Sequence, residues 1–291
     1  MNYAQAVLAY ILWGIFPLYW KLLPSVNAYE IICHRIVWSL LTLIICVHLT
    51  KQWPHIRALT LQTKRLKLCI LAAVFISMNW FIFIWAVQHG YLVETSLGYF
   101  INPMLNVLLG VLFFREQLHR LQWLAISIAV VGVAIMTLQT GEFPWIAVSL
   151  ALSFSFYSVV KKLTTLPAIA GLGMETAILA PISVVSLIIF SRASIEVEPK
   201  SVSTWILLIL GGPITTLPLV LFAAAAKQVP MVAMGMLQYI SPSIQFVLGV
   251  VLFQEEVTSG RVVGFAMVWL ALAVFSAYAI VSARRIKPVA S

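Results

Sequence analysis

The sequence contains no aspartate and very little charge of either sign. Its 291 residues include nine acidic side chains, all glutamate, and 18 lysines and arginines, so only 9% of the chain is charged while 62% is hydrophobic. A soluble protein of this length exposes far more charge. The composition therefore excludes a soluble globular domain and predicts a polytopic membrane protein.

Cysteines are few, and the motifs of common enzymes are absent. The three cysteines, Cys33, Cys46 and Cys69, are an odd number and lie in or beside apolar runs, which indicates small apolar side chains and not disulfides. The sequence has no glycine-rich phosphate loop, no HExxH, no CxxC and no Ser-His-Asp set. We therefore expect a protein that is not an enzyme and that holds no cofactor and no metal.

The net charge of +9 is explained by membrane topology and not by nucleic acid, because the basic residues lie in short loops between apolar runs. With the N-terminus inside, 13 of the 18 lysines and arginines lie in cytoplasmic loops. Cytoplasmic loops carry such an excess. We expect a multi-pass protein of the inner (plasma) membrane with both termini cytoplasmic, whose partners are the lipid bilayer and a small molecule.

Ten apolar runs are long enough to cross the membrane as helices. About 20 helical residues cross roughly 30 Å of hydrocarbon. The predicted spans lie near 4–22, 32–50, 67–87, 92–114, 120–138, 144–161, 173–191, 203–224, 230–253 and 261–282.

The fourth of these runs is written twice. Residues 98–116 recur without gaps 139 positions later, so that Ile101, Pro103, Leu109, Gly110, Val111, Phe114 and Glu116 match Ile240, Pro242, Leu248, Gly249, Val250, Phe253 and Glu255. Ten helices then divide into two sets of five, and an odd number per set forces the halves into opposite orientations. We expect an all-α integral membrane fold of two inverted five-helix repeats, residues 1–140 and 141–291.

The repeated helices carry polar stripes. A spacing of three, four and four residues places each set on one helix face: Tyr99, Asn102, Asn106 and Gly110 in one half, and Gln238, Ser241, Gln245 and Gly249 in the other. Amides that face lipid are costly, so both stripes should face protein or a water-filled cavity. Each residue alone fits helix–helix packing, whereas the duplication favours a cavity lining.

Other residues of the two halves complete the predicted site. Pro103 and Pro242 each remove a helical hydrogen bond and would shape the cavity, while the glycines of the stripes would permit close helix contact. Trp80 offers a flat face to an aromatic or cationic ligand. The predicted substrate-binding residues are Asn79, Trp80, Tyr99, Asn102, Asn106, Gln238, Tyr239, Ser241 and Gln245.

Three titratable residues lie close to or inside the bilayer. His34 and Arg35 begin the second predicted helix, and Glu175, 140 positions after Arg35, begins the seventh. An interfacial anchor or a structural ion pair is the favoured interpretation. The alternative is that these residues form gates or sense the charge of the substrate.

Several motifs give the chain a family resemblance. It resembles the RarD group of EamA-type transporters, in the drug/metabolite transporter superfamily, at the motifs Asn79-Trp80, Glu94-Thr-Ser-Leu-Gly-Tyr-Phe-Ile-Asn-Pro103, His34-Arg35, Glu175-Thr176, Thr215-Thr216-Leu-Pro218 and Gln238-Tyr-Ile-Ser-Pro242. The resemblance implies a ten-helix inner-membrane carrier with a cavity lined mainly by its third, fourth, eighth and ninth helices. It also links the group by name to chloramphenicol sensitivity.

The sequence thus predicts a secondary transporter of small metabolites or drugs that works by alternating access. A membrane channel is the alternative, and an enzyme that modifies lipids fits less well because no cluster of acids, histidine or nucleophile lies at one interface. Coupling to a proton or an ion, the direction of transport, and a monomer or a homodimer stay open.

Overall fold

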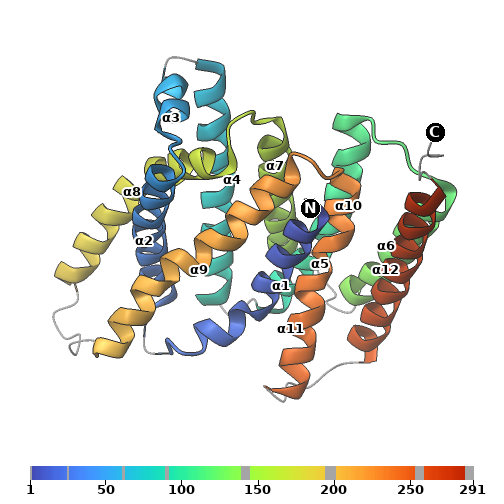
Figure 1. Cartoon of the computed structure of the whole chain (residues 1–291). Helices are drawn as coiled ribbons and strands as arrows, with labels where there is room; N and C mark the ends of the chain where they lie inside the picture. Colours follow the sequence, from blue (N-terminus) through green and yellow to red (C-terminus); the bar gives the residue numbers. More distant parts are fainter. Residues whose placement is uncertain are drawn as a thin grey trace.

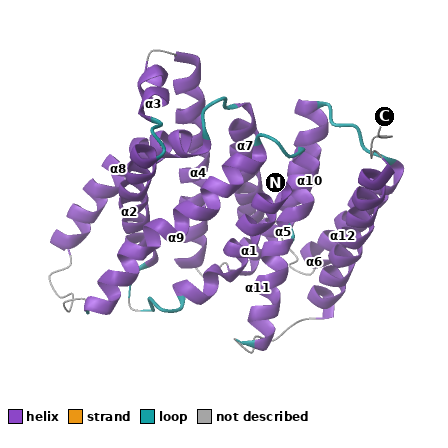
Figure 2. Ribbon diagram, in the orientation of Figure 1, coloured by secondary structure: helices purple, strands orange, loops and turns teal. Residues whose placement is uncertain are grey.

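The structure is a computed structural model, and it describes residues 2–24, 26–60, 63–88, 92–138, 145–193, 201–252 and 259–285. Within these ranges all regular structure is helical (Figure 2). The helices are α1 (Asn2–Trp20), α2 (Ala28–Leu49), α3 (Trp53–Thr60), α4 (Thr63–Gln88), α5 (Leu92–Phe114), α6 (Arg120–Leu138), α7 (Trp145–Leu163), α8 (Ala168–Ala193), α9 (Val202–Ala226), α10 (Met231–Gln238), α11 (Ile240–Val251) and α12 (Ser259–Arg285).

The predicted all-α membrane fold is confirmed. Eight described segments are long and apolar enough to cross a bilayer, and two shorter apolar stretches, Gly98–Phe114 and Val262–Tyr278, lie within α5 and α12. These stretches coincide with the fourth and tenth predicted spans. The number of ten crossings stays a prediction.

Two helical features differ from the expected runs. The short helix α3 follows the second span, where only a loop was expected. The expected span 230–253 is divided into α10 and α11 at Tyr239. Pro242 has no N–H with which to bond the carbonyl of Gln238, the last residue of α10, so the break falls where a hydrogen bond is missing. Pro103, by contrast, lies inside a continuous α5.

The helix contacts follow a regular pattern. In the predicted repeats, α1, α2, α4, α5 and α6 correspond to α7, α8, α9, α10–α11 and α12. The contact of α4 with α7 then has its counterpart in α9 with α1, and α5 with α7 in α11 with α1. The pairs α2–α8, α6–α12 and α5–α10 each join corresponding helices. In Figure 1, α2 and α8 lie at the left, α6 and α12 at the right, and α1, α5 and α10 between them.

Small residues let the central helices approach closely. An added Cβ at Gly212 of α9 would lie 2.4 Å from the backbone carbonyl carbon of Trp38 in α2. At Gly235 of α10 it would lie 2.6 Å from the carbonyl oxygen of Pro103 in α5. Neither backbone can yield to such a clash, so these positions hold the helices at their observed separation.

Candidate functional site

The two polar stripes meet in the interior. The amide Nδ2 of Asn106 donates to Oε1 of Gln238 at 2.8 Å and to Oδ1 of Asn102 at 3.2 Å. Asn106 is 1% exposed and Gln238 is 6% exposed. The bond therefore joins α5 to α10 in a place where an unpaired amide would be costly.

The first-half amides are engaged mainly by α7, a partner that the sequence did not suggest. Each amide Nδ2 donates to a backbone carbonyl and to a serine hydroxyl of α7 at 2.8 to 3.1 Å: Asn79 bonds Leu150 and Ser153, and Asn102 bonds Ala151 and Ser155. These N–H groups bind helices to one another and are not free to contact a ligand. The serines within the apolar sequence of α7 are the feature that could have predicted these contacts between helices.

The remaining second-half residues also lie between helices. The buried Tyr239 hydroxyl donates to the carbonyl of Phe100 at 3.2 Å, and Nε2 of Gln245 donates to the carbonyl of Trp13 at 3.2 Å. Ser241 is buried. Gly249 lies in α11, and its surroundings fall outside the described residues.

Tyr99 and Trp80 are more accessible than the amides. Tyr99 is 40% exposed, although it lies on the same face of α5 as the buried Asn102 and Asn106. Trp80 forms one wall of a cavity between α2, α4, α8 and α9, together with Ser39, Thr216 and several apolar residues. This cavity thus borders α2 and α8, and not only the predicted helices.

Glu175 lies in a buried cluster of charged and polar side chains. Glu175 forms an ion pair with Lys161 of α7, with Oε1 and Nζ 2.7 Å apart, and the two side chains are 3% and 1% exposed. The Tyr157 hydroxyl donates to the same carboxylate at 3.4 Å. Lys227, at the end of α9, interacts electrostatically with the pair, and its pKa is lowered to about 8 by burial and then by the charge of Lys161. This cluster fits the structural ion pair that was the favoured interpretation of Glu175.

His34 and Arg35 have distinct surroundings. Nε2 of His34 lies 3.6 Å from the carboxylate of Glu30, one helical turn earlier. Arg35 donates from Nε to the Thr215 hydroxyl at 3.0 Å, and its guanidinium lies over the Trp80 ring. Of the two, only Arg35 contacts the wall of the cavity.

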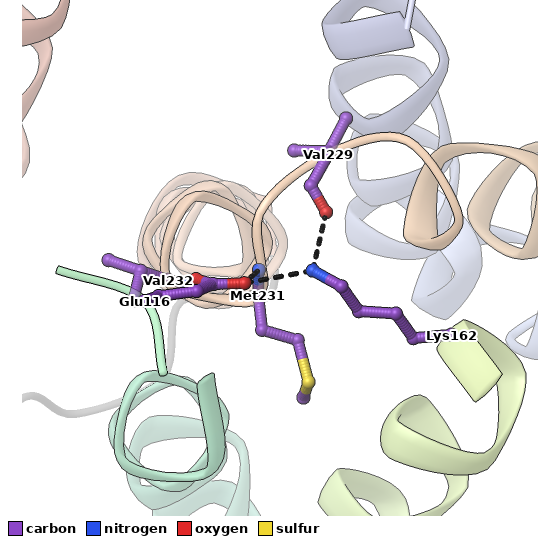
Figure 3. Close-up of polar contacts among 5 residues, drawn as sticks. All are labelled: Glu116, Lys162, Val229, Met231 and Val232. Atoms are coloured by element: carbon purple, nitrogen blue, oxygen red, sulfur yellow. Dashed lines mark hydrogen bonds and ion pairs between the residues drawn. The ribbon is translucent and has the colours of Figure 1, made fainter. Parts of the chain in front are cut away.

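Glu116, which was not among the predicted site residues, forms a polar cluster with Lys162 and the start of α10 (Figure 3). Its Oε1 accepts from the N–H of Met231 at 2.7 Å and from Nζ of Lys162 at 2.8 Å, and its Oε2 accepts from the N–H of Val232 at 2.9 Å. Lys162 also donates to the carbonyl of Val229. Glu116 thus caps the N-terminus of α10, where a negative charge is favoured. The repeat of Glu116 as Glu255 is the sequence feature that could have identified it as a site residue.

Gly110 allows this capping contact. An added Cβ there would lie 3.0 Å from Oε2 of Glu116 and 3.0 Å from Cβ of Met231. The N–H of Glu116 bonds back to the carbonyl of Gly110 at 3.2 Å, and Arg115 takes a positive φ of 51° where the chain turns out of α5. The glycine therefore leaves space for both the carboxylate and α10.

The contact between Asn106 and Gln238 predicts an energetic coupling between α5 and α10. Asn106→Leu should destabilise the protein by about 1–3 kcal/mol, because it leaves the buried amide of Gln238 without its donor. Gln238→Leu should do the same, and the double variant should cost less than the sum of the two. A double-mutant cycle of thermal unfolding in detergent measures the coupling. Strict additivity would contradict it.

Comparison with known proteins identifies the family. The EamA-like transporter family matches residues 2–138. The "Uncharacterized transporter YojE" of Bacillus subtilis (strain 168) is 44% identical, over 92% of this chain and 91% of its own. "Protein RarD" of Escherichia coli (strain K12) is 38% identical, over 96% of this chain and 95% of its own. The chain belongs to the EamA-like transporter family.

Within this family the chain groups with the RarD proteins. "Chloramphenicol-sensitive protein RarD" of Pseudomonas aeruginosa is 30% identical, over 91% of this chain and 89% of its own. A solved crystal structure with 19% identity superposes with a TM-score of 0.71, over 94% of this chain and 96% of the other, and shares the fold. This EamA protein is therefore a multi-pass membrane protein of a transporter family, and its membership of the drug/metabolite transporter superfamily follows.

Proposed function

We propose that the protein is a secondary transporter of small metabolites or drugs, in which two inverted halves, residues 1–140 and 141–291, rock against each other. The observation that carries this proposal is the Glu116 cluster. It joins the end of α5, in the first half, to α7 and α10, in the second, through contacts at one end of the central helices. A carrier needs a closure of this kind that can form and break at one face at a time.

The cluster has the chemistry of a reversible closure. The side chains of Glu116 and Lys162 are 15% and 16% exposed, so water can replace their bonds when the helices separate. A fully buried pair would resist such an exchange. The regular contacts of corresponding helices, such as α4–α7 with α1–α9, support the same view because they allow two equivalent packings of the halves.

The predicted orientation in the membrane indicates which face the Glu116 cluster closes. If both termini lie in the cytoplasm, as the distribution of basic residues predicts, Glu116 lies in a loop on the cytoplasmic side and Glu255 in a loop on the outer side. Glu255, whose placement is outside the described residues, would then close the outer face in the opposite state.

A reversible disulfide tests alternating access without a known substrate. In a variant lacking Cys33, Cys46 and Cys69, Gly110→Cys and Met231→Cys place two Cβ atoms 3.0 Å apart, so a small separation of α5 and α10 gives the roughly 3.5–4.5 Å that a disulfide requires. A further variant, Tyr99→Cys, reports access to the interior. We expect a membrane-impermeant maleimide to label this reporter from both faces under reducing conditions, and only from the outer face after oxidation.

The controls are the two single cysteine variants with the same reporter, which oxidation should not affect. Labelling from both faces that oxidation leaves unchanged would reject the proposal. A channel, the alternative, would conduct steadily: sustained unitary currents in planar bilayers would favour it. The name of the Pseudomonas aeruginosa relative supports chloramphenicol sensitivity as the first cellular phenotype to compare between cells with and without this chain.

A further inference from the structure

We propose that Arg35 forms the binding site for an anionic group of the substrate, a carboxylate or a phosphate. This inference rests on the proposed transport function and adds a substrate class to it. Neither the family match nor the names of the relatives assign such a class. The evidence is the cage around the guanidinium, its unused donors, and the accessible side chain and small cavity beside it.

The guanidinium lies between aromatic faces. Its Cζ is 4.7 Å from the ring centroid of Trp20 in α1 and 5.4 Å from that of Trp80 in α4. Cation–π contacts of this kind stabilise the charge of an arginine and orient its plane without neutralising it. Tyr19 and Tyr99 lie close enough to interact with the charge electrostatically. Arg35 is therefore held in place while its positive charge is retained.

Most donors of Arg35 are unused by the residues that the structure describes. A guanidinium carries five N–H donors in a fork that matches a carboxylate or a phosphate. Among the described residues, Nε donates to Thr215, and the two terminal nitrogens donate to no side chain or carbonyl. Arg35 is only partly buried, so water or a ligand can reach the guanidinium.

The position equivalent to Arg35 in the other half makes the contrast clear. Glu175, 140 residues later, is neutralised by Lys161 at 2.7 Å and sealed from solvent. Among the residues that the structure describes, no carboxylate forms an ion pair with Arg35. The internal charge of the second half is therefore satisfied within the protein, whereas that of the first half is available to a ligand.

An accessible side chain and a small cavity adjoin the cage. Tyr99, which interacts with the charge of Arg35, is 40% exposed. Trp80, which covers one face of the guanidinium, also lines the cavity between α2, α4, α8 and α9. In that cavity the buried hydroxyl of Thr216 has no partner among the described residues. In this conformation the cavity has room for little more than a water molecule. An anion on Arg35 would thus lie beside it, and the Thr216 hydroxyl would be a further polar group within the cavity wall.

The position of Arg35 reverses the ligand charge that Trp80 alone suggested. A bare tryptophan face attracts cationic ligands, but here Arg35 already occupies it. A second cation beside the guanidinium would be repelled at short range in a medium of low dielectric. The cage therefore selects against cations and for anions.

The test compares four probes on the purified full-length protein in lipid nanodiscs at fixed ionic strength. The probes are benzoate, phenyl phosphate, the neutral benzamide and the cationic benzylamine, and binding is followed by tryptophan fluorescence and thermal unfolding. We expect benzoate or phenyl phosphate to bind at least tenfold more tightly than benzamide, and benzylamine to bind most weakly. The stronger of the two anions identifies the carboxylate or the phosphate as the preferred group.

Variants then assign the preference to Arg35. Arg35→Gln should reduce anion affinity roughly 10- to 100-fold, since a charge-assisted bond is lost, and leave benzamide unchanged. Arg35→Lys should keep the preference for anions at reduced affinity, because it keeps the charge without the fork. The matched control is Arg120→Gln, at the exposed start of α6, which should bind like the wild type.

Chemical modification of the wild-type protein tests the same inference if the Arg35→Gln variant does not fold. Phenylglyoxal should modify Arg35, and benzoate should protect it, as read by mass spectrometry of the peptide. The inference is overturned if benzamide or benzylamine binds as tightly as the anions, if a folded Arg35→Gln keeps the preference, or if no protection occurs. Two-sided maleimide labelling would be intact in all three cases, which separates this failure from a failure of alternating access.

Discussion

Glu175→Gln is expected to destabilise the protein by about 3–5 kcal/mol, the range for removing one partner of a buried ion pair. Without the carboxylate, Lys161 keeps a charge that is sealed from water and that faces Lys227 instead of an acid. Tyr157 also loses its acceptor. Unfolding in a graded series of dodecyl sulfate, followed by circular dichroism, measures the loss.

The partner variant should be less harmful. Lys161→Met leaves Glu175 with the nearby positive charge of Lys227 and with the Tyr157 hydroxyl, so part of the compensation is kept. The double variant Lys161→Met with Glu175→Leu, which removes both charges, should regain most of the stability because apolar pairs often replace buried ion pairs without loss. Equal losses of stability in Glu175→Gln and Lys161→Met would contradict the proposal that Lys227 partly compensates the charge of Glu175.

Glu116→Gln is expected to shift the protein toward the state that is open at the cytoplasmic face. The amide keeps one oxygen but presents an N–H₂ group to the N–H of Met231 or Val232 or to Lys162, so at least one charge-assisted bond is lost. Because the cluster is partly exposed, we expect a loss of about 1.4 kcal/mol, which is a tenfold change in the equilibrium. The measurement is the rate of maleimide labelling of the Tyr99→Cys reporter from the cytoplasmic face, which should rise.

Two related variants test the direction of this effect. Lys162→Gln should shift labelling the same way but less, because Glu116 still caps the N–H groups of α10. Glu255→Gln, at the repeated position, should raise labelling from the outer face instead. A shift in the same direction for Glu116→Gln and Glu255→Gln would contradict the inverted relation of the two halves.

The comparison of Asn102 with Tyr99 shows how far helix periodicity reaches. The spacing places both on one face of α5, because a helix repeats every 3.6 residues. It does not say what that face meets. Asn102 donates to the carbonyl of Ala151 and to the hydroxyl of Ser155, whereas Tyr99, about one turn away, lies beside the Phe83 ring and is 40% exposed.

The sequence by itself determined the membrane fold, the position of most helices, the repeat and the family, because each depends on local hydropathy or on motifs within one run. Only the tertiary structure decided that the amides of Asn79 and Asn102 bind α7, that Glu175 is neutralised by Lys161 while Arg35 lies close to two tryptophan rings, and that Glu116 caps α10. These contacts join residues from separate helices. They depend on how closely glycines such as Gly110, Gly212 and Gly235 let backbones approach, which no pattern within a single helix encodes.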